Sequence, residues 1–193
     1  SDLFIKSIHP EKKQPDLQIS VLNKHTDFAE HNEFIQPLLR GENIGLMSES
    51  GCPGVADPGA VIVKLAHEKG IQVVPLVGPS SILLALMASG MNGQSFAFNG
   101  YLPIDKNDKK QALKNFERLS QDKNQSQLFI ETPYRNNKLM EDLLQILQPN
   151  TLLCVACDIT LPTEFIKTKT VNQWKKEKAD LHNRPCIFII HKM

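Results

Sequence analysis

The chain has 193 residues, 41% of them hydrophobic and 22% charged, which is typical of a folded protein with one or two compact domains. Its 22 basic and 21 acidic residues give a formal net charge of +1, which argues against a strongly basic surface and a large RNA footprint. No apolar run approaches the roughly 20 residues of a membrane helix and no export signal opens the chain, so we expect a cytoplasmic protein without membrane contact.

The first half of the chain alternates between strand and helix patterns. The predicted strands cover 17–22, 43–48 and 71–75, and the predicted helices cover 30–40, 59–70 and 82–89. This alternation is typical of parallel strands with covering helices. We therefore expect an N-terminal α/β domain with a parallel sheet over residues 1–94.

The stretch 45–58, GLMSESGCPGVADP, leads from an apolar strand into a loop dense with small residues. Gly51 and Gly54 can adopt positive φ and leave space for a ligand, while Pro53 stiffens the turn. Asp57 then provides an acidic cap for the next helix. Such a loop can bring backbone amides close to a bound molecule. The plain alternative is that Asp57 only caps its helix and that the serines of the loop only satisfy the turn.

A second loop, Gly78-Pro79-Ser80-Ser81, follows the next predicted strand and opens another helix. The first helical amides would point outward with a partial positive charge, ready for a carboxylate or a phosphate. An ordinary serine-capped helix is the alternative. In a parallel α/β sheet both loops would lie at the carboxyl ends of strands, where ligands bind.

The second half indicates a second α/β domain, which we place at residues 95–193 after a linker over 91–94. The predicted helices cover 109–119 and 136–147, and the predicted strands cover 96–100, 127–131, 152–159, 164–168 and 185–191. Consecutive strands with short connections near the end favour a mixed sheet.

Two further groups of residues invite a chemical interpretation. In the run from Glu131 to Arg135, Tyr134 could stack on a base and Arg135 could meet a phosphate, although an ordinary surface arginine is the commoner outcome. The pair Cys154 and Cys157 has the spacing of a zinc motif, but residues three apart on a strand point to opposite faces. We expect free thiols there and no metal site.

Five ordered runs resemble the tetrapyrrole methylase superfamily, and within it the bacterial 16S ribosomal RNA 2′-O-ribose cytidine methyltransferases. These runs are Ser48–Pro53 with Asp57–Gly59, Pro75–Ser80, Ser89-Gly90, Phe98–Pro103 and Glu131–Arg135. The resemblance covers most of the chain, and five matches in order are far more specific than any one of them.

The resemblance implies two α/β domains with S-adenosylmethionine in a cleft between them, and usually a homodimer. The first loop would pass beside the methionine part of the cofactor and the second would support the opposite wall. The implied cofactor-binding residues are Ser48, Ser50, Gly51, Pro53, Gly54, Asp57, Gly78, Pro79, Ser80 and Ser81. The implied chemistry is methyl transfer from a sulfonium, with a base to take the proton of a hydroxyl acceptor. Our own candidates for that catalytic role are Glu49 and Glu131.

The chain also departs from the family pattern. An R-E-L-T-K motif of that branch aligns with Cys157-Asp158-Ile159-Thr160-Leu161, so its arginine and lysine are absent. The acceptor therefore stays open between the ribose 2′-hydroxyl of ribosomal RNA and a tetrapyrrole or other small molecule. A protein of the same fold that binds S-adenosylmethionine or S-adenosylhomocysteine without turnover, or that acts as a partner protein, is a further alternative. Nothing before Leu17 resembles the strand and small loop that begin the family's members, so we expect an N-terminal domain that lacks them.

Overall fold

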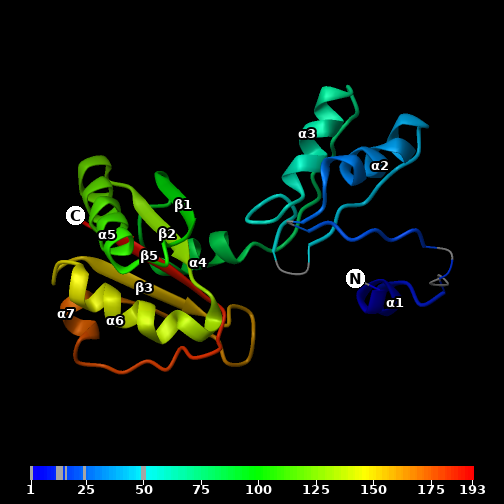
Figure 1. Ribbon diagram of the computed structural model, residues 1–193. Helices are drawn as coiled ribbons and strands as arrows, with labels where there is room; N and C mark the ends of the chain where they lie inside the picture. Colours follow the sequence, from blue (N-terminus) through cyan, green and yellow to red (C-terminus); the bar gives the residue numbers. More distant parts are fainter. Residues whose placement is uncertain (1, 12–14, 16, 24, 49–50) are drawn as a thin grey trace. The chain divides into compact units, whose positions relative to one another are not determined.

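The computed structural model describes residues 2–11, 15, 17–23, 25–48 and 51–193. The chain forms two compact units, Ser1–Pro79 and Ser80–Met193, and each is described by itself (Figure 1). Within the described ranges, no helix is both long and apolar enough to cross a membrane.

The first unit contains α1 (Asp2–Ile8), α2 (Phe28–Leu39) and α3 (Ala60–Glu68). A capping box starts α2: Asp27 accepts from the amide of Glu30, whose side chain accepts from the amide of Asp27. A small cluster of Ile35, Leu65 and Ala66 packs α2 against α3. The predicted helices over 30–40 and 59–70 are therefore confirmed.

The strands predicted in the first unit are wrong for the described residues. The structure assigns no strand to 17–22, 43–48 or 71–75. A strand exists only through its ladder to a partner, and local alternation of apolar residues does not supply one. Val21 and Val74 are 74% and 63% exposed. Ile71 and Val73 pack against the α2–α3 cluster, but this burial does not bring a strand partner. The predicted parallel N-terminal sheet is thus not present among the described residues of this unit.

The second unit is built on one mixed sheet of five strands. The strands are β1 (Phe96–Tyr101), β2 (Ser126–Ile130), β3 (Leu152–Cys157), β4 (Phe165–Thr170) and β5 (Cys186–His191). Their order is β1-β2-β5-β3-β4, in which β1 and β2 are parallel and the other neighbours are antiparallel. The predicted mixed sheet is confirmed, and so is the α/β class.

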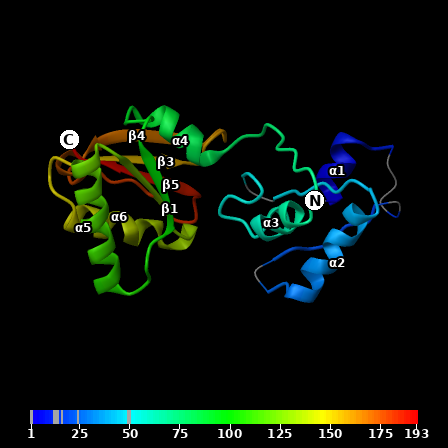
Figure 2. The same cartoon turned by 90° about the horizontal axis from the view of Figure 1, so that it is seen from above.

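Helices cover both faces of this sheet. One face carries α4 (Ser81–Ser89), and the other carries α5 (Lys106–Lys123), α6 (Asn136–Ile146) and the short α7 (Val171–Trp174). The alternation along β5 divides the core, because Ile187 and Ile189 join the cluster under α4 while Phe188 and Ile190 join the other. Figure 2 shows α4 and α6 on opposite sides of the strands.

The compact units divide after Pro79, whereas the sequence predicts a domain boundary at residue 94. The two divisions differ in where they put α4. In the structure Ala85 and Leu86 of α4 are buried against the sheet of the second unit, and Thr168 of β4 donates a hydrogen bond of 2.7 Å to the carbonyl of Ser89. The domain boundary near residue 94 stays a prediction.

Candidate functional site

The first glycine loop is closed by the side chain of Asp57. Its Oδ1 accepts hydrogen bonds from the amide of Gly54 at 3.1 Å and from the amide of Gly59 at 2.8 Å. The hydroxyl of Ser48 also hydrogen-bonds to this carboxylate. The predicted helix cap is wrong in detail, since Gly59 is the N-cap residue of α3 and no side chain caps it. Asp57 instead ties the loop to the start of the helix.

These contacts set the charge of Asp57. Partial burial alone would raise the pKa of its carboxyl group. The amides of Gly54 and Gly59 and the hydroxyl of Ser48 outweigh that effect, so the pKa lies below its ordinary value. The loop therefore holds a carboxylate at neutral pH, already occupied by donors of the loop itself.

The backbone of the loop uses its glycines as the sequence predicts. Gly51 and Gly54 have φ of +83° and +79°, a region that favours glycine. At Gly59 space is the constraint, because an added Cβ would lie 2.9 Å from Oδ1 of Asp57. Two predicted site residues, Glu49 and Ser50, lie outside the described residues.

The first loop reaches the start of the second one. The thiol of Cys52 donates to the carbonyl oxygen of Pro79 at 3.5 Å, within the range of a hydrogen bond from sulfur. Both residues belong to the first unit. The sequence predicts that the two loops are neighbours. Cys52 belongs to the first loop and Pro79 to the second, so this hydrogen bond joins the two loops.

The start of α4 has no side-chain cap. Ser80 is its N-cap residue, in extended conformation, and its hydroxyl makes no capping hydrogen bond. The carbonyl of Ser80 accepts from the amide of Leu84 at 2.9 Å. The alternative of a serine-capped helix is therefore wrong, and the first turn of α4 keeps amide donors that its N-cap hydroxyl does not use.

The run from Glu131 to Arg135 lies in the second unit, where β2 leads through the 3₁₀ turn η2 (Pro133–Arg135) into α6. Glu131 is 7% exposed, and its Oε1 accepts from the amide and the hydroxyl of Thr132 at 2.7 and 3.2 Å. Arg135 donates from Nη2 to the hydroxyl of Tyr134 at 2.8 Å, and its guanidinium lies 5.1 Å from the centre of that ring. The hydrogen bond from Arg135 is the main cause that lowers the pKa of Tyr134.

This arrangement leaves Tyr134 at the surface. The ring of Tyr134 is 58% exposed and so remains accessible to a planar group. Stacking on an aromatic side chain and a nearby guanidinium are features that proteins use to hold unstacked bases and phosphates.

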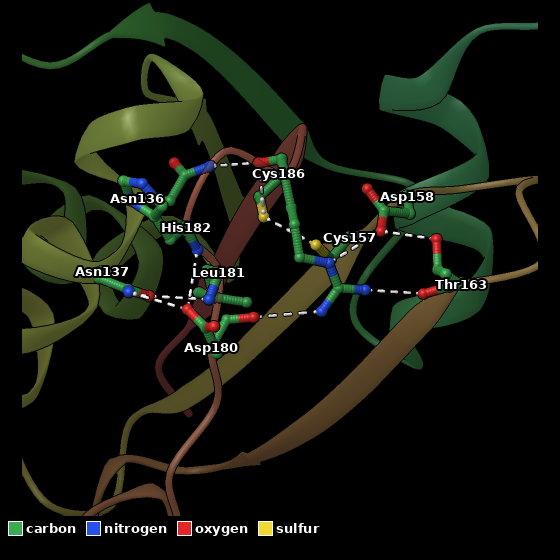
Figure 3. Close-up of polar contacts among 10 residues, drawn as sticks. Asn136, Asn137, Cys157, Asp158, Thr163, Asp180, Leu181, His182 and Cys186 are labelled. Carbon is green, nitrogen blue, oxygen red and sulfur yellow. Dashed lines mark hydrogen bonds and ion pairs between the residues drawn. The ribbon is translucent and has the colours of Figure 1, made fainter.

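Sequence reasoning missed a polar network centred on Arg184 (Figure 3). Its Nε donates to Oδ2 of Asp158 at 2.8 Å, and the same oxygen accepts from the hydroxyl of Thr163 at 2.9 Å. Its Nη2 and Nη1 donate to the carbonyls of Thr163 and Asp180 at 2.7 and 3.1 Å. Burial would raise the pKa of Asp158, but the hydrogen bonds from Arg184 and Thr163 lower it.

The network adjoins the Glu131–Arg135 run through Asn136. Nδ2 of Asn136 donates to the carbonyl of Arg184 at 2.6 Å, and the amide of Asn183 donates to the carbonyl of Pro133 at 3.1 Å. Oδ1 of Asn136 is buried and has no hydrogen-bond partner among the described residues. The sequence held one signal for this network, because Asp158 belongs to the run that departs from the R-E-L-T-K motif. That run lacks the arginine of the motif, and Arg184 from another part of the chain donates to Asp158 instead.

The cysteines follow the strand geometry. Cys154 belongs to the core under α4, while Cys157 belongs to the core on the other face of the sheet. Cys157 lies beside Cys186 instead, with 3.1 Å between the sulfur atoms, and all four cysteines are free thiols. Burial raises the pKa of both Cys157 and Cys186, so these thiols stay protonated at neutral pH.

Comparison with known proteins identifies one matching family. The sequence pattern of the Tetrapyrrole (Corrin/Porphyrin) Methylases matches residues 4–174. Curated relatives carry the name ribosomal RNA small subunit methyltransferase I. The protein of that name from Buchnera aphidicola subsp. Schizaphis graminum is 30% identical over 172 residues, which are 88% of this chain and 59% of the relative. The one from Escherichia coli O157:H7 is 28% identical over 176 residues, 90% of this chain and 60% of the relative.

The chain thus spans about three fifths of the length of these relatives. Solved structures share the fold. The methyltransferase CobJ superposes with a TM-score of 0.62 at 14% identity, over 94% of this chain and 77% of that one. The native uroporphyrin III C-methyl transferase from Thermus thermophilus gives 0.50 at 18% identity, over 85% and 70%.

Proposed function

The chain belongs to the tetrapyrrole (corrin/porphyrin) methylases, and we propose from this that it transfers a methyl group from S-adenosylmethionine to a ribose 2′-hydroxyl of small-subunit ribosomal RNA. The observation that carries the proposal is the first glycine loop. It matches the family's motif at Ser48, Gly51, Pro53 and Asp57–Gly59. Its glycines Gly51 and Gly54 adopt positive φ, and Asp57 closes it.

The loop suits a methyl donor that is already chemically activated. The sulfonium of S-adenosylmethionine is already a good methyl donor, so the protein mainly has to hold donor and acceptor in line. Gly51 and Gly54 supply backbone without side chains, and the uncapped first turn of α4 supplies donors suited to a carboxylate. Together with Ser48, Pro53, Asp57, Gly78 and Ser81, these form the proposed cofactor contacts.

A hydroxyl acceptor must lose a proton during transfer, and Glu131 is the proposed base in the described part of the chain. Its Oε1 is held by Thr132, whereas Oε2 has no hydrogen bond within the described residues. Thr132 thereby fixes the carboxylate while one oxygen stays available for a proton. Glu49 remains the second candidate. Tyr134 and Arg135 are the proposed contacts to a base and a phosphate of the RNA.

A second candidate function is binding of S-adenosylmethionine or S-adenosylhomocysteine without turnover. The run from Cys157 to Leu161 favours it, because the arginine and lysine of the family motif are absent there. The family's name keeps a tetrapyrrole acceptor as a third candidate. We also propose a homodimer, as the resemblance implies, and a cytoplasmic location, as the sequence predicts.

Calorimetry tests the binding of the methyl donor, which all three candidates share. S-adenosylmethionine and S-adenosylhomocysteine should both bind the chain, and Gly54→Val should weaken both by at least about tenfold, because valine disfavours a positive φ. Gly45→Val is the matched control, since an added Cβ there meets nothing within 4 Å and its φ is not positive. Unchanged affinity in Gly54→Val would remove the first loop from the cofactor site.

A further inference from the structure

A cavity of about 630 Å³ opens between α5 and α6 in the second unit, apart from the residues discussed above. Lysines of α5 form one wall, and α6 contributes a carboxylate and an amide. The polar lining residues that matter are Lys106, Lys109, Lys110, Lys114, Asp142 and Gln145. We call this cavity the lysine groove.

A buried ion pair forms the floor of the lysine groove. Nζ of Lys109 lies 3.2 Å from Oδ2 of Asp142, and each side chain is only 10% exposed. Lys109 occupies the core-facing side of α5, one turn before the fully buried Leu113. Because Asp142 neutralises Lys109, the floor carries little net charge.

The rim, by contrast, carries positive charge without partners. Lys106, Lys110 and Lys114 are exposed, and within the described ranges none of them takes part in an ion pair. Asp142 is the one carboxylate that lines the groove, and Lys109 and Lys138 already occupy its two oxygens. The groove therefore attracts anions, although the chain as a whole is nearly neutral.

The spacing of the rim suits a charged polymer. Residues four apart follow one face of a helix, and with a rise of about 1.5 Å per residue the three lysines advance in steps of about 6 Å. Lysine ammonium groups on flexible stems act as point charges, which tolerate the varied positions of successive phosphates. The side chain of Asp105 already takes the amides of Asn107 and Asp108, so the helix N-terminus is not the anion site.

We propose that the lysine groove binds the phosphate backbone of the RNA substrate and orients the RNA without reading its sequence. This inference rests on the proposed function and adds to it a binding surface separate from the cofactor residues. Gln145 at the groove adds an amide that can hydrogen-bond a ribose or a phosphate oxygen.

The test is the salt dependence of RNA affinity. A fluorescein-labelled single-stranded oligoribonucleotide is titrated with the chain at several KCl concentrations. The triple variant Lys106→Gln, Lys110→Gln, Lys114→Gln should bind at least about tenfold more weakly at low salt. It should also lower the magnitude of the slope of log K against log[KCl] by about 2, at about 0.7 for each lost phosphate contact. The charge-matched control Lys175→Gln, Lys176→Gln, Lys178→Gln changes exposed lysines elsewhere in the unit and should bind like the unaltered chain.

Three results would overturn the groove proposal. The first is a triple variant with the affinity and slope of the unaltered chain. The second is competition by inorganic phosphate or a mononucleotide as strong as that by RNA, which would indicate a small-anion site. The third is an unaltered chain that binds no RNA. Calorimetry with S-adenosylmethionine separates failure of the groove proposal from failure of the proposed function. The groove is separate from the cofactor residues, so the triple variant should bind the cofactor with the same affinity as the unaltered chain.

Discussion

The carboxylate of Asp57 accepts the backbone amide of Gly54 at 3.1 Å, so the side chain that ends the first glycine loop also closes it. The same oxygen holds the amide of Gly59, the N-cap residue of α3. Loop shape and helix position thus depend on one carboxylate. This links the family motif to a physical role: the aspartate fixes the turn, and the turn presents the backbone to a ligand.

Replacing Asp57 by alanine should open the loop. Two amides and a serine hydroxyl lose their acceptor, which should cost about 1–3 kcal/mol of local stability. Hydrogen exchange at Gly54 and Gly59 measures this directly, and both amides should exchange faster. Asp57→Asn keeps an oxygen acceptor and should show a smaller effect. Equal exchange rates in Asp57→Ala and the unaltered chain would contradict the closure.

Gly59→Ala tests the space behind the loop. An added Cβ would lie 2.7 Å from Cδ2 of Leu46 and 2.9 Å from Oδ1 of Asp57. The leucine end can move, but the carboxylate can move only by giving up its hydrogen bonds. The expected cost in unfolding free energy is about 1–3 kcal/mol, measured by urea denaturation. Gly45→Ala has open space around its Cβ and should lie within about 0.5 kcal/mol of the unaltered chain.

Asp142→Asn should destabilise the second unit strongly. The change leaves the ammonium of Lys109 buried without its counter-charge, which typically costs about 3–5 kcal/mol. Glu141→Gln is the matched control, because Glu141 pairs with Lys138 at the surface and should contribute at most about 1 kcal/mol. Denaturation by urea compares the two variants. A loss in Asp142→Asn no larger than that in Glu141→Gln would mean that the ion pair is solvated.

The Arg184 network predicts a pH dependence. The pKa of Asp158 is lower in the folded chain than its unfolded value of about 3.9, so the unfolded chain binds the proton more readily. The stabilisation is therefore complete above the unfolded pKa and is lost as the pH falls through the folded pKa. Asp158→Asn should lose stability at pH 7 and show a shallower further loss on acidification below about pH 4. Asp122→Asn, in an exposed pair with Arg118, should keep the acid profile of the unaltered chain.

The sequence predicts the second unit better than the first, for a physical reason. The helix expected over 109–119 is the centre of α5 (Lys106–Lys123), and the strand expected over 185–191 is β5 (Cys186–His191). Both elements contain residues that are buried in the core of the second unit, such as Leu113 of α5 and Phe188 of β5. The strands expected over 17–22, 43–48 and 71–75 have similar patterns but no strand partner within the described part of the chain. Sequence alone does not show whether a partner exists.

The candidate site divides in the same way. The positive φ of Gly51 and Gly54 follows from local chemistry and was predictable. The bond from Arg184 to Asp158 joins two segments of the chain that only the pairing of β3 with β5 brings together, so no local pattern announces it. Asp57 is an intermediate case. The sequence predicts it as a helix cap, whereas in the structure it also accepts a hydrogen bond from the amide of Gly54 within the loop.

The most direct measurement is methyl transfer from S-adenosylmethionine labelled in its methyl group to 30S subunits that lack ribose methylation. The rRNA is then digested to nucleosides for analysis. We predict label in a 2′-O-methylated nucleoside, reduced at least about tenfold in Glu131→Gln if that carboxylate takes the proton. An absence of label from every 2′-O-methylated nucleoside, whether or not the cofactor binds, would contradict the proposed function.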